Sequence, residues 1–151
     1  MPKLKIIASG TFDRLHEGHK YFLREAFKIG FPFIAITADE MLSEKEFSEL
    51  IHPYKKRRSE LVKYLRRLGY KWREDYKILK IKDRFGFAID IEDLDAILIS
   101  SETRDNAEEI NRIRKKKGFH PLLIFEIPLL EDEKGKISST RRRKEEMRKL
   151  G

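Results

Sequence analysis

Short apolar runs alternate with amphipathic stretches along this sequence. The runs that predict strands occupy residues 4–8, 33–37, 76–82, 95–100 and 122–125. The run at 33–37 is apolar or β-branched, as strands covered on both faces are, whereas lysines interrupt 76–82 and predict an edge strand. The run at 122–125 predicts the last central strand.

The stretches between these runs carry apolar residues at helical spacing, about 3.6 residues per turn. They predict helices at residues 18–29, 53–69, 103–117 and 138–150. The residues expected to face the core are Phe22, Ala26 and Ile29 in the first helix, Leu61, Leu65 and Leu68 in the second, and Ala107, Ile110 and either Ile113 or the stem of Arg114 in the third.

Glycine, proline and polar clusters mark the ends of these elements. Gly30, Gly69 and Gly118 are expected to end the first three helices, and Pro32 to block continuation of the first. The connecting segments are 38–49, a loop or short helical turn; 83–93, a loop with a short helix; and 128–136, an acidic loop that contains glycine.

Strands that alternate with helices over 151 residues predict an α/β protein with one domain, residues 1–151. The expected architecture has three layers, α/β/α, around a five-stranded parallel sheet with right-handed crossovers. No internal repeat, low-complexity segment or interdomain linker interrupts the alternation.

Composition narrows the classes of function. A net charge of +8 and a pI near 9.6 favour an anionic partner, either nucleic acid or a phosphorylated metabolite. Charged residues of both signs make up 40% of the chain and glutamine is absent, as in heat-adapted proteins rich in ion pairs, so most of the excess charge is expected to be solvated surface. The absence of cysteine excludes disulfides, thiolate metal sites and a cysteine nucleophile.

Two further observations bear on location. No run approaches the roughly 18 consecutive apolar residues of a membrane span. The first residues lead directly into the first predicted strand, with no signal-like apolar segment before it. We therefore expect a cytoplasmic protein with no membrane partner.

Residues 9–19 read Ser-Gly-Thr-Phe-Asp-Arg-Leu-His-Glu-Gly-His and connect the first predicted strand to the first predicted helix. In an open parallel sheet, ligands bind at the carboxyl ends of the strands. A helix N-terminus there offers unpaired N–H groups and about half a positive charge to an anion. Thr11, His16 and His19 add donors at this junction, which predicts a nucleoside triphosphate site.

The histidines also admit a purely structural role as polar caps, or a metal site with Glu17 adjacent. The spacing differs from the His-Glu-x-x-His arrangement of zinc hydrolases and no obvious third ligand follows, so no metal site is predicted. Gly10 and Gly18 favour a ligand, because each removes a side chain where a ligand must approach closely.

A second loop that enters a helix reads Lys-Ile-Ser-Ser-Thr-Arg-Arg-Arg at residues 136–143. Ser138, Ser139 and Thr140 can donate hydroxyl or backbone N–H bonds to phosphate, although such residues at a helix start are usually only caps. Arg143 shares a helix face with Ser139 and can reach back over the first turn. Because charge-assisted hydrogen bonds contribute about 1.5–3 kcal/mol each, the two helix starts together could hold a triphosphate without the Walker lysine motif, which the chain lacks.

Residues 10–19 and 137–143 resemble the His-x-Gly-His and Ile-Ser-Ser-Thr-x-x-Arg signatures of the nucleotidyltransferase superfamily. In length and spacing, and over nearly the whole chain, the sequence is most similar to the archaeal type of the phosphopantetheine adenylyltransferase family. The resemblance implies a dinucleotide-binding-like (Rossmann-like) fold. It also implies transfer of AMP from ATP to 4′-phosphopantetheine, giving dephospho-coenzyme A and pyrophosphate.

The resemblance also implies roles for individual residues. His16 and His19 would contact the ATP phosphates, Thr11 would orient the acceptor phosphate, and Lys45 would lie between acceptor and triphosphate. Arg143 completes the set implied to act in catalysis. The residues implied to bind ATP are Gly10, Thr11, His16, Gly18, His19, Glu102, Thr103, Ser138, Ser139, Thr140 and Arg143. Those implied to bind the acceptor are Thr11 and Lys45.

Residues 100–103 resemble the nucleotide-side loop of the family, but the next three, Arg-Asp-Asn, stand where an aromatic residue or proline is expected. The chemistry agrees with the rest of the resemblance. A phosphate monoester is already a nucleophile, so catalysis requires in-line positioning and stabilisation of charge on the phosphates. Mg²⁺ is expected to arrive with ATP, because it prefers substrate oxygens and water to an all-protein cage.

Two alternatives remain open from the sequence. Related transferases act on nicotinamide mononucleotide, flavin mononucleotide or a polyol phosphate, and the signature loops serve them all. A non-catalytic nucleic-acid-binding module would use the basic clusters at 55–58, 115–117 and 141–144, although no recognised nucleic-acid motif accompanies them. We therefore expect a small-molecule partner and no nucleic acid, while the sequence does not indicate an oligomeric state.

Overall fold

The computed structural model describes residues 3–42, 48–128, 131–132 and 135–136. Five parallel strands form one sheet in the order β3-β2-β1-β4-β5. The strands are β1 (Leu4–Gly10), β2 (Gly30–Thr37), β3 (Lys77–Ile81), β4 (Ala96–Ser100) and β5 (Leu123–Ile127). The α-helices are α1 (Glu17–Ile29), α2 (Tyr54–Arg67) and α3 (Arg104–Lys116). The 3₁₀ turns are η1 (Asp39–Met41), η2 (Ser48–Leu50) and η3 (Ser101–Thr103).

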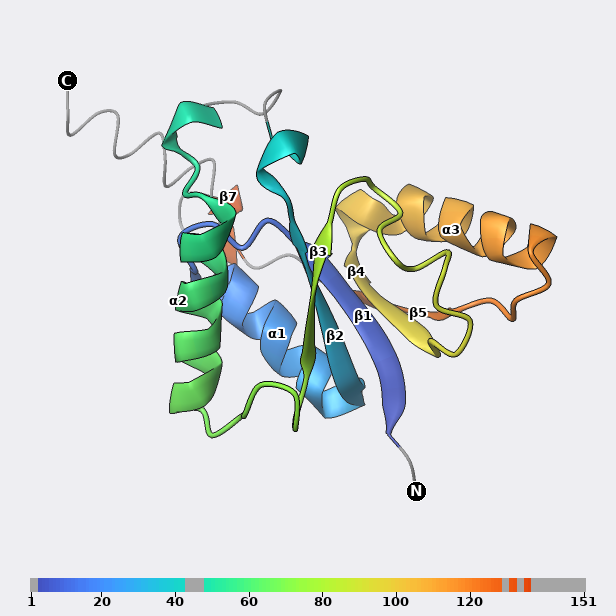
Figure 1. Cartoon of the computed structure of the whole chain (residues 1–151), viewed down its shortest axis with the longest axis horizontal. Helices are drawn as coiled ribbons and strands as arrows, with labels where there is room; N and C mark the ends of the chain where they lie inside the picture. The colour runs from blue at the N-terminus through green and yellow to red at the C-terminus, as the bar shows by residue number, and fades with distance from the viewer. Residues whose placement is uncertain (1–2, 43–47, 129–130, 133–134, 137–151) are drawn as a thin grey trace.

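Three layers are visible in Figure 1, with α1 and α2 on one side of the sheet and α3 on the other. This confirms the predicted α/β class with a five-stranded parallel sheet and the prediction that β3 is an edge strand. The prediction of a central strand at 122–125 is wrong, because β5 forms the opposite edge and Leu123 is 56% exposed.

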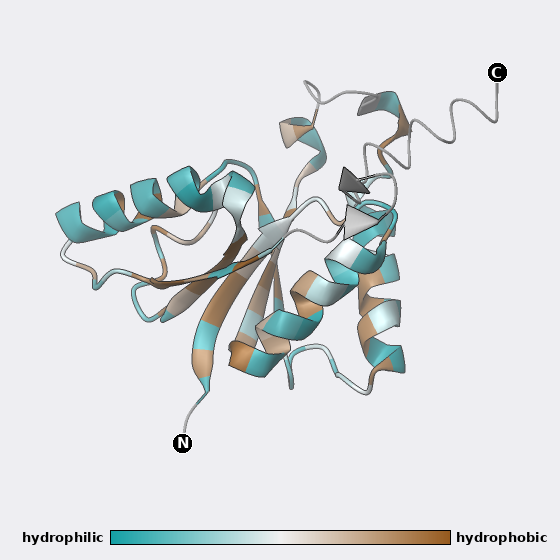
Figure 2. Cartoon of the chain, turned by 180° about the vertical axis from the view of Figure 1, so that it is seen from behind, coloured by the Kyte–Doolittle hydropathy of each residue, from teal (hydrophilic) through white to brown (hydrophobic). Residues whose placement is uncertain are grey.

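Alternate residues of the central strands point to opposite faces, as the pleat of a strand requires. Ile6 and Ala8 of β1 pack with Ala26 of α1, whereas Ile7 packs with Ile110 of α3 on the other face. Figure 2 shows the same division, with hydrophobic strands between helices whose outer surfaces are hydrophilic. The sheet is therefore covered on both faces, as its apolar runs predicted.

The first connection is tighter than the sequence indicated. Gly30 caps α1 and already begins β2, three residues before the predicted start. A Cβ atom on Gly30 would lie 2.0 Å from the carbonyl oxygen of Leu4, so only glycine fits beside β1 there. Pro32 continues the strand, because β3 pairs with β2 only from Phe33 onward and leaves one side of Pro32 without a neighbouring strand.

The α2 helix begins after Pro53, and its core-facing residues only partly match the prediction. Leu61 and Leu65 are fully buried as expected, but Leu68 is the residue that caps the helix and is 45% exposed. Arg57, one turn before Leu61, is fully buried instead. The stripe is therefore shifted by one turn toward the N-terminus of α2.

The segment between β3 and β4 contains hydrogen-bonded turns and no helix, contrary to the short helix predicted at 83–93. It is held to α3 by Arg114, which was one of the two predicted inward residues and is fully buried. Its guanidinium donates to the backbone carbonyls of Ala88, Ile91, Glu92 and His120 at 2.8–2.9 Å. Arg114 thus satisfies backbone groups that a helix would have paired internally.

The segment predicted as the acidic loop 128–136 contains two short antiparallel strands, β6 (Glu131–Asp132) and β7 (Gly135–Lys136). The predicted final helix, 138–150, lies outside the described residues. In the part of the chain that the structure describes, no helix is long and apolar enough to cross a membrane.

Candidate active site

The loop between β1 and α1 is held in a strained conformation. Phe12 and Arg14 have φ angles of 54° and 49°, in the left-handed region that side chains other than glycine rarely adopt. Phe12 is 1% exposed and packs among core residues of α1 and α2, including Leu23 and Leu61. Such strain persists only where the surroundings fix the backbone, and it is concentrated at functional sites.

Asp13, between these two residues, is a fully buried carboxylate. It accepts a hydrogen bond from Nη1 of Arg14 at 2.6 Å and one from the backbone N–H of His52 at 3.1 Å. The Nδ1 atom of His52 lies 3.5 Å from the same carboxylate. Asp13 therefore ties the loop after β1 to the segment that leads into α2, and it supports the loop from the interior.

His16 and His19 form a reciprocal cap at the N-terminus of α1. The Nδ1 atom of His16 accepts hydrogen bonds from the backbone N–H groups of Gly18 at 3.0 Å and His19 at 3.4 Å. The Nδ1 atom of His19 accepts from the N–H of His16 at 3.3 Å. The two rings stack with centroids 3.8 Å apart. Because each Nδ1 accepts, these bonds assign the ring hydrogen of both neutral imidazoles to Nε2.

The two glycines of the motif have different surroundings. Gly18 donates its backbone N–H to His16, so it takes part in the cap. A Cβ atom on Gly10 would lie 3.1 Å from the ring of Phe12, which shows that close packing with Phe12 already requires a small residue there. The close approach of a ligand to Gly10 and Gly18 stays a prediction.

Thr11 lies beside the end of β2. Its hydroxyl oxygen is 3.3 Å from Oγ1 of Thr37, and its carbonyl accepts a hydrogen bond from Nη1 of Arg57 at 2.9 Å. Arg57 was not among the site residues predicted from the sequence, where it belonged to the basic cluster 55–58. Its spacing of four residues from buried Leu61 was the signal that indicated a core-facing position.

The order of the strands identifies the end of the sheet at which a ligand would bind. From β1 the chain continues to β2 and β3 on one side of the sheet and then returns to β4 on the other side of β1. The switch point, where the order of the strands changes direction, therefore lies between β1 and β4. Ligands of open parallel sheets bind at the carboxyl ends of the strands beside this point. The histidine cap follows β1 directly, so the structure places it at that position.

A cavity of about 110 Å³ lies at the switch point and is lined by Ser9, Ser100 and Thr103 among other residues. An open hollow of about 530 Å³ is lined by Glu102 and also by Thr103, while Asn106 lines both spaces. Glu102 and Thr103 are exposed on η3, and the hydroxyl of Thr103 donates to the carbonyl of Ser100 at 3.3 Å. The structure thus brings the nucleotide-side loop to the same end of the sheet as the histidine cap.

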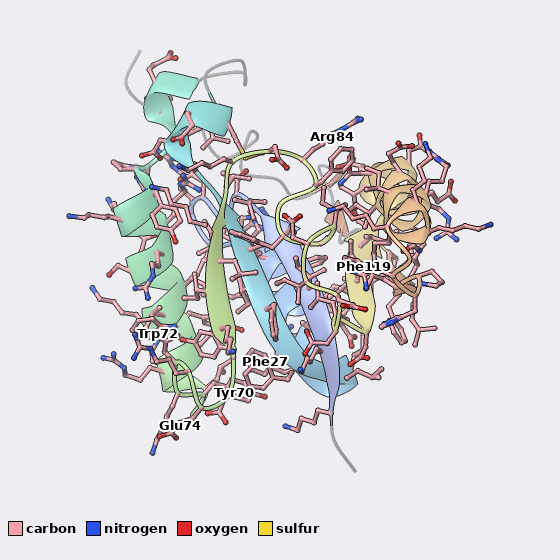
Figure 3. All side chains as sticks on the ribbon, turned by 45° about the vertical axis from the view of Figure 1, so that its right-hand side comes forward. Phe27, Tyr70, Trp72, Glu74, Arg84 and Phe119 are labelled. Atoms are coloured by element: carbon pink, nitrogen blue, oxygen red, sulfur yellow. The ribbon has the colours of Figure 1, made fainter. Side chains whose placement is uncertain are left out.

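Asn106 supplies a polar group that the sequence had marked only as a departure from the family pattern. Its Nδ2 donates to the carbonyl of Arg84 at 2.8 Å, which fixes the orientation of the amide. Its Oδ1 is buried and accepts no hydrogen bond from the residues that the structure describes. Figure 3 shows Arg84 at one end of the sheet, with Phe27 and Tyr70 at the other. A ligand with an N–H donor would satisfy this oxygen.

The other predicted site residues lie outside the described part of the chain. They are Lys45, Ser138, Ser139, Thr140 and Arg143. Among the described residues no group of three or more histidine or acidic side chains is arranged to hold a metal ion.

The described half of the site carries hydrogen-bond donors of the kind that suit an anion. The N-terminus of α1 carries partial positive charge, and the stacked imidazoles beside it present their ring hydrogens on Nε2. The strained loop and the buried Asp13 hold these donors in place without a ligand. Preorganised donors of this kind stabilise charge on phosphate oxygens as it develops in a transition state.

Comparison with known proteins agrees with this geometry. The model of the cytidylyltransferase-like family matches residues 7–145. The chain is 44% identical to a phosphopantetheine adenylyltransferase of Pyrococcus furiosus over 138 residues, which cover 90% of this chain and 84% of the relative. It is 38% identical to a phosphopantetheine adenylyltransferase of Methanothermobacter thermautotrophicus over 97% of this chain and 87% of the relative.

A solved structure from Archaeoglobus fulgidus, a protein of unknown function, superposes with a TM-score of 0.71. Its sequence is 29% identical, and the match covers 82% of this chain and 89% of that one. Fold, loop geometry and sequence therefore agree. The chain belongs to the cytidylyltransferase-like nucleotidyltransferases and, within them, to the phosphopantetheine adenylyltransferase family.

Proposed function

We propose that this protein is an adenylyltransferase that joins ATP and 4′-phosphopantetheine to give dephospho-coenzyme A and pyrophosphate. The observation that carries the proposal is the stacked His16–His19 cap at the switch point of the sheet, in a chain 44% identical to a phosphopantetheine adenylyltransferase. A capping box uses only the Nδ1 acceptors of the two rings, so the Nε2 donors that they carry at a helix N-terminus support a role in binding phosphate.

The reaction requires no covalent intermediate with the protein. An oxygen of the acceptor phosphate attacks the α-phosphorus of ATP, the bond from that phosphorus to the β-phosphate oxygen breaks, and pyrophosphate leaves with the electron pair. His16 and His19 would donate to the phosphates from Nε2, and Thr11 would orient the attacking phosphate. Lys45 would lie between the two substrates and stabilise charge in the transition state.

The second loop and the metal belong to the same proposal. Ser138, Ser139, Thr140 and Arg143 would hold the β- and γ-phosphates and so draw charge toward the leaving group. Mg²⁺ would enter as part of the ATP substrate, bound to phosphate oxygens and water. On the nucleotide side, Glu102 and Thr103 line the open hollow beside the cavity.

Release of pyrophosphate from ATP, measured with a panel of phosphorylated acceptors, tests the proposal. We expect turnover with 4′-phosphopantetheine and none with unphosphorylated pantetheine, which lacks the nucleophile. The panel should include nicotinamide mononucleotide, flavin mononucleotide and a polyol phosphate. If phosphopantetheine gives no pyrophosphate while one of these acceptors turns over, the proposed acceptor is wrong.

The same assay should compare ATP with CTP, because the matching family model describes cytidylyltransferase-like proteins. The Oδ1 of Asn106, a buried acceptor with no partner among the described residues, would suit an N–H donor, which both the bases and the amides of pantetheine carry. We expect ATP to be the better donor. A higher kcat/KM with CTP would assign the protein to cytidylyl transfer instead.

A further inference from the structure

Arg57 of α2 has a fully buried guanidinium that lies between the carboxyl ends of two strands. Its Nη1 donates to the carbonyl of Thr11, after β1, at 2.9 Å and to Oγ1 of Thr37, at the end of β2, at 3.3 Å. One nitrogen of one side chain therefore holds both turns. The planar fork of an arginine fixes such a geometry, whereas the ammonium of a lysine does not.

The other two nitrogens of Arg57 bind the segments that flank η2. Its Nη2 donates to Oδ1 of Asp39 at 2.9 Å, and its Nε donates to the carbonyl of His52 at 2.8 Å. Asp39 also accepts from the backbone N–H of Tyr54, which ties it to the start of α2. Every nitrogen of the buried guanidinium thus has a partner, and the carboxylate of Asp39 balances its charge.

The direction of these bonds determines what the hydroxyl of Thr11 can do. A guanidinium only donates, so the oxygen of Thr37 must accept from Arg57. The hydrogen of the Thr37 hydroxyl is then directed to the oxygen of Thr11, 3.3 Å away. The oxygen of Thr11 thus accepts from Thr37, and this contact fixes where the Thr11 hydroxyl lies. The chain of donors runs from Arg57 through Thr37 to Thr11.

We propose that Arg57 is a positioning residue for adenylyl transfer, acting through Thr37 to hold the Thr11 hydroxyl as a hydrogen-bond donor toward the acceptor phosphate. The inference rests on the proposed function, in which Thr11 meets that phosphate. Arg57 touches no substrate in this arrangement. It sets the place and the polarity of the group that does.

Three variants test the chain of donors. Arg57→Lys keeps the charge but loses the fork, and Thr37→Val keeps the shape of the side chain but removes the hydroxyl. We expect each to lower kcat/KM for 4′-phosphopantetheine by roughly 10- to 100-fold and to leave the KM for ATP within about twofold. Thr37→Ser restores the hydroxyl and should recover most of the loss.

Arg114→Lys is the matched control. Arg114 is equally buried and also donates every guanidinium nitrogen, but only to backbone carbonyls on the opposite side of the sheet. It should lower the unfolding temperature as Arg57→Lys does. Below that temperature its kcat and both KM values should stay within about twofold of the parent.

The outcomes separate the inference from the function on which it rests. If the parent forms no pyrophosphate with ATP and phosphopantetheine, the proposed function fails. If the parent is active and folded Arg57→Lys and Thr37→Val match its kcat/KM for the acceptor, the positioning role is wrong. An equal loss in Arg114→Lys would also overturn it, because general destabilisation would then explain the effect. If Arg57→Lys does not fold, Thr37→Val and Thr37→Ser decide the question.

Discussion

His16 has two roles that different atoms of its ring perform. Its Nδ1 accepts the N–H groups of Gly18 and His19 and so stabilises the start of α1. Its Nε2 carries the ring hydrogen that the proposed function assigns to the ATP phosphates. Because the two nitrogens lie in one side chain, replacement by alanine would remove both effects at once.

Replacing His16 with asparagine should separate the two roles. Asparagine is among the best N-cap residues, so we expect His16→Asn to keep the unfolding free energy within about 0.5 kcal/mol of the parent, whereas His16→Ala loses about 1 kcal/mol. Loss of the Nε2 donor should lower kcat by roughly 100-fold in both variants. Urea unfolding and pyrophosphate release measure the two quantities. An active His16→Asn protein would show that the imidazole serves only as a cap.

Tyr76 carries a buried hydroxyl that makes no hydrogen bond within the described residues. Burial raises the pKa of this phenol, so the folded state disfavours the phenolate. A group whose pKa is raised on folding contributes stability below its unfolded pKa, about 10, and loses that contribution as the pH rises through the folded value. The hydroxyl therefore weakens the protein in alkaline solution.

Tyr76→Phe should accordingly be at least as stable as the parent at pH 7, with a gain of up to about 1 kcal/mol, because it removes an unpaired polar group. Its advantage should grow above pH 10, where the parent begins to lose stability. Tyr64→Phe is the control, since the Tyr64 hydroxyl accepts from Arg24 at 3.4 Å. Unfolding temperatures measured from pH 7 to 11 check both. A Tyr76→Phe protein less stable than the parent at every pH would contradict this account.

At the scale of elements, the α3 helix shows how a mostly polar helix is held on a sheet. Figure 2 shows it as hydrophilic over most of its length. Its buried apolar residues are Ala107 and Ile110. Arg114 adds four hydrogen bonds to backbone carbonyls, which fasten the segment between β3 and β4 as well. Hydrogen bonds from Arg114 thus hold α3 in place where few apolar side chains are buried.

The contact between β1 and β2 depends on Gly30, because the space beside it is too small for any side chain. We expect Gly30→Ala to lower the unfolding free energy by at least about 2 kcal/mol, because its Cβ would overlap the carbonyl of Leu4 and part the two strands at their start. Gly118→Ala is the comparison. Its φ of 81° strains an alanine by about 1 kcal/mol, but no atom lies within 4 Å of the added carbon. Urea midpoints that ranked Gly118→Ala as the more damaging change would refute the close approach.

At the scale of the whole molecule, local sequence patterns predicted where the strands and helices lie better than they predicted which elements lie next to one another. Apolar runs located β1, β2 and β4, because strands covered on both faces are apolar throughout, and shorter or interrupted apolar runs located β3 and β5. The edge position of β5 depends on strand order, which no local pattern records. The buried Arg57 was missed because its partners Thr11, Thr37 and Asp39 lie on other segments of the chain.

The candidate site divides in the same way. The motif at residues 9–19 predicted a strand, a turn and a helix start in succession with both histidines at the helix start, and a cap was the structural alternative to a ligand site. The cap bonds between His16 and His19 confirm that geometry. The support from Asp13 and the acceptor at Asn106 needed coordinates, because each depends on residues distant in sequence.

The net charge of +8 is less available to a polyanion than its size suggests. Arg57 and Arg114 are fully buried, and several exposed basic residues face acidic neighbours one turn away. These pairs are Lys20–Glu17, Lys28–Glu25, Arg104–Glu108 and Arg112–Glu109. Such pairs contribute little stability individually, but they reduce the local positive potential.

We therefore expect DNA and RNA to bind no more tightly than roughly 10⁻⁶ M at physiological salt, with affinity that falls steeply as salt is added. ATP should instead raise the unfolding temperature, because it binds the folded state alone. Replacing both His16 and His19 with asparagine should abolish that ATP-dependent rise and leave the weak nucleic-acid binding unchanged. Fluorescence anisotropy with labelled oligonucleotides and thermal unfolding with ATP measure the two effects. Nanomolar binding of nucleic acid, together with no response to ATP, would identify a nucleic-acid-binding module and contradict the enzyme proposed above.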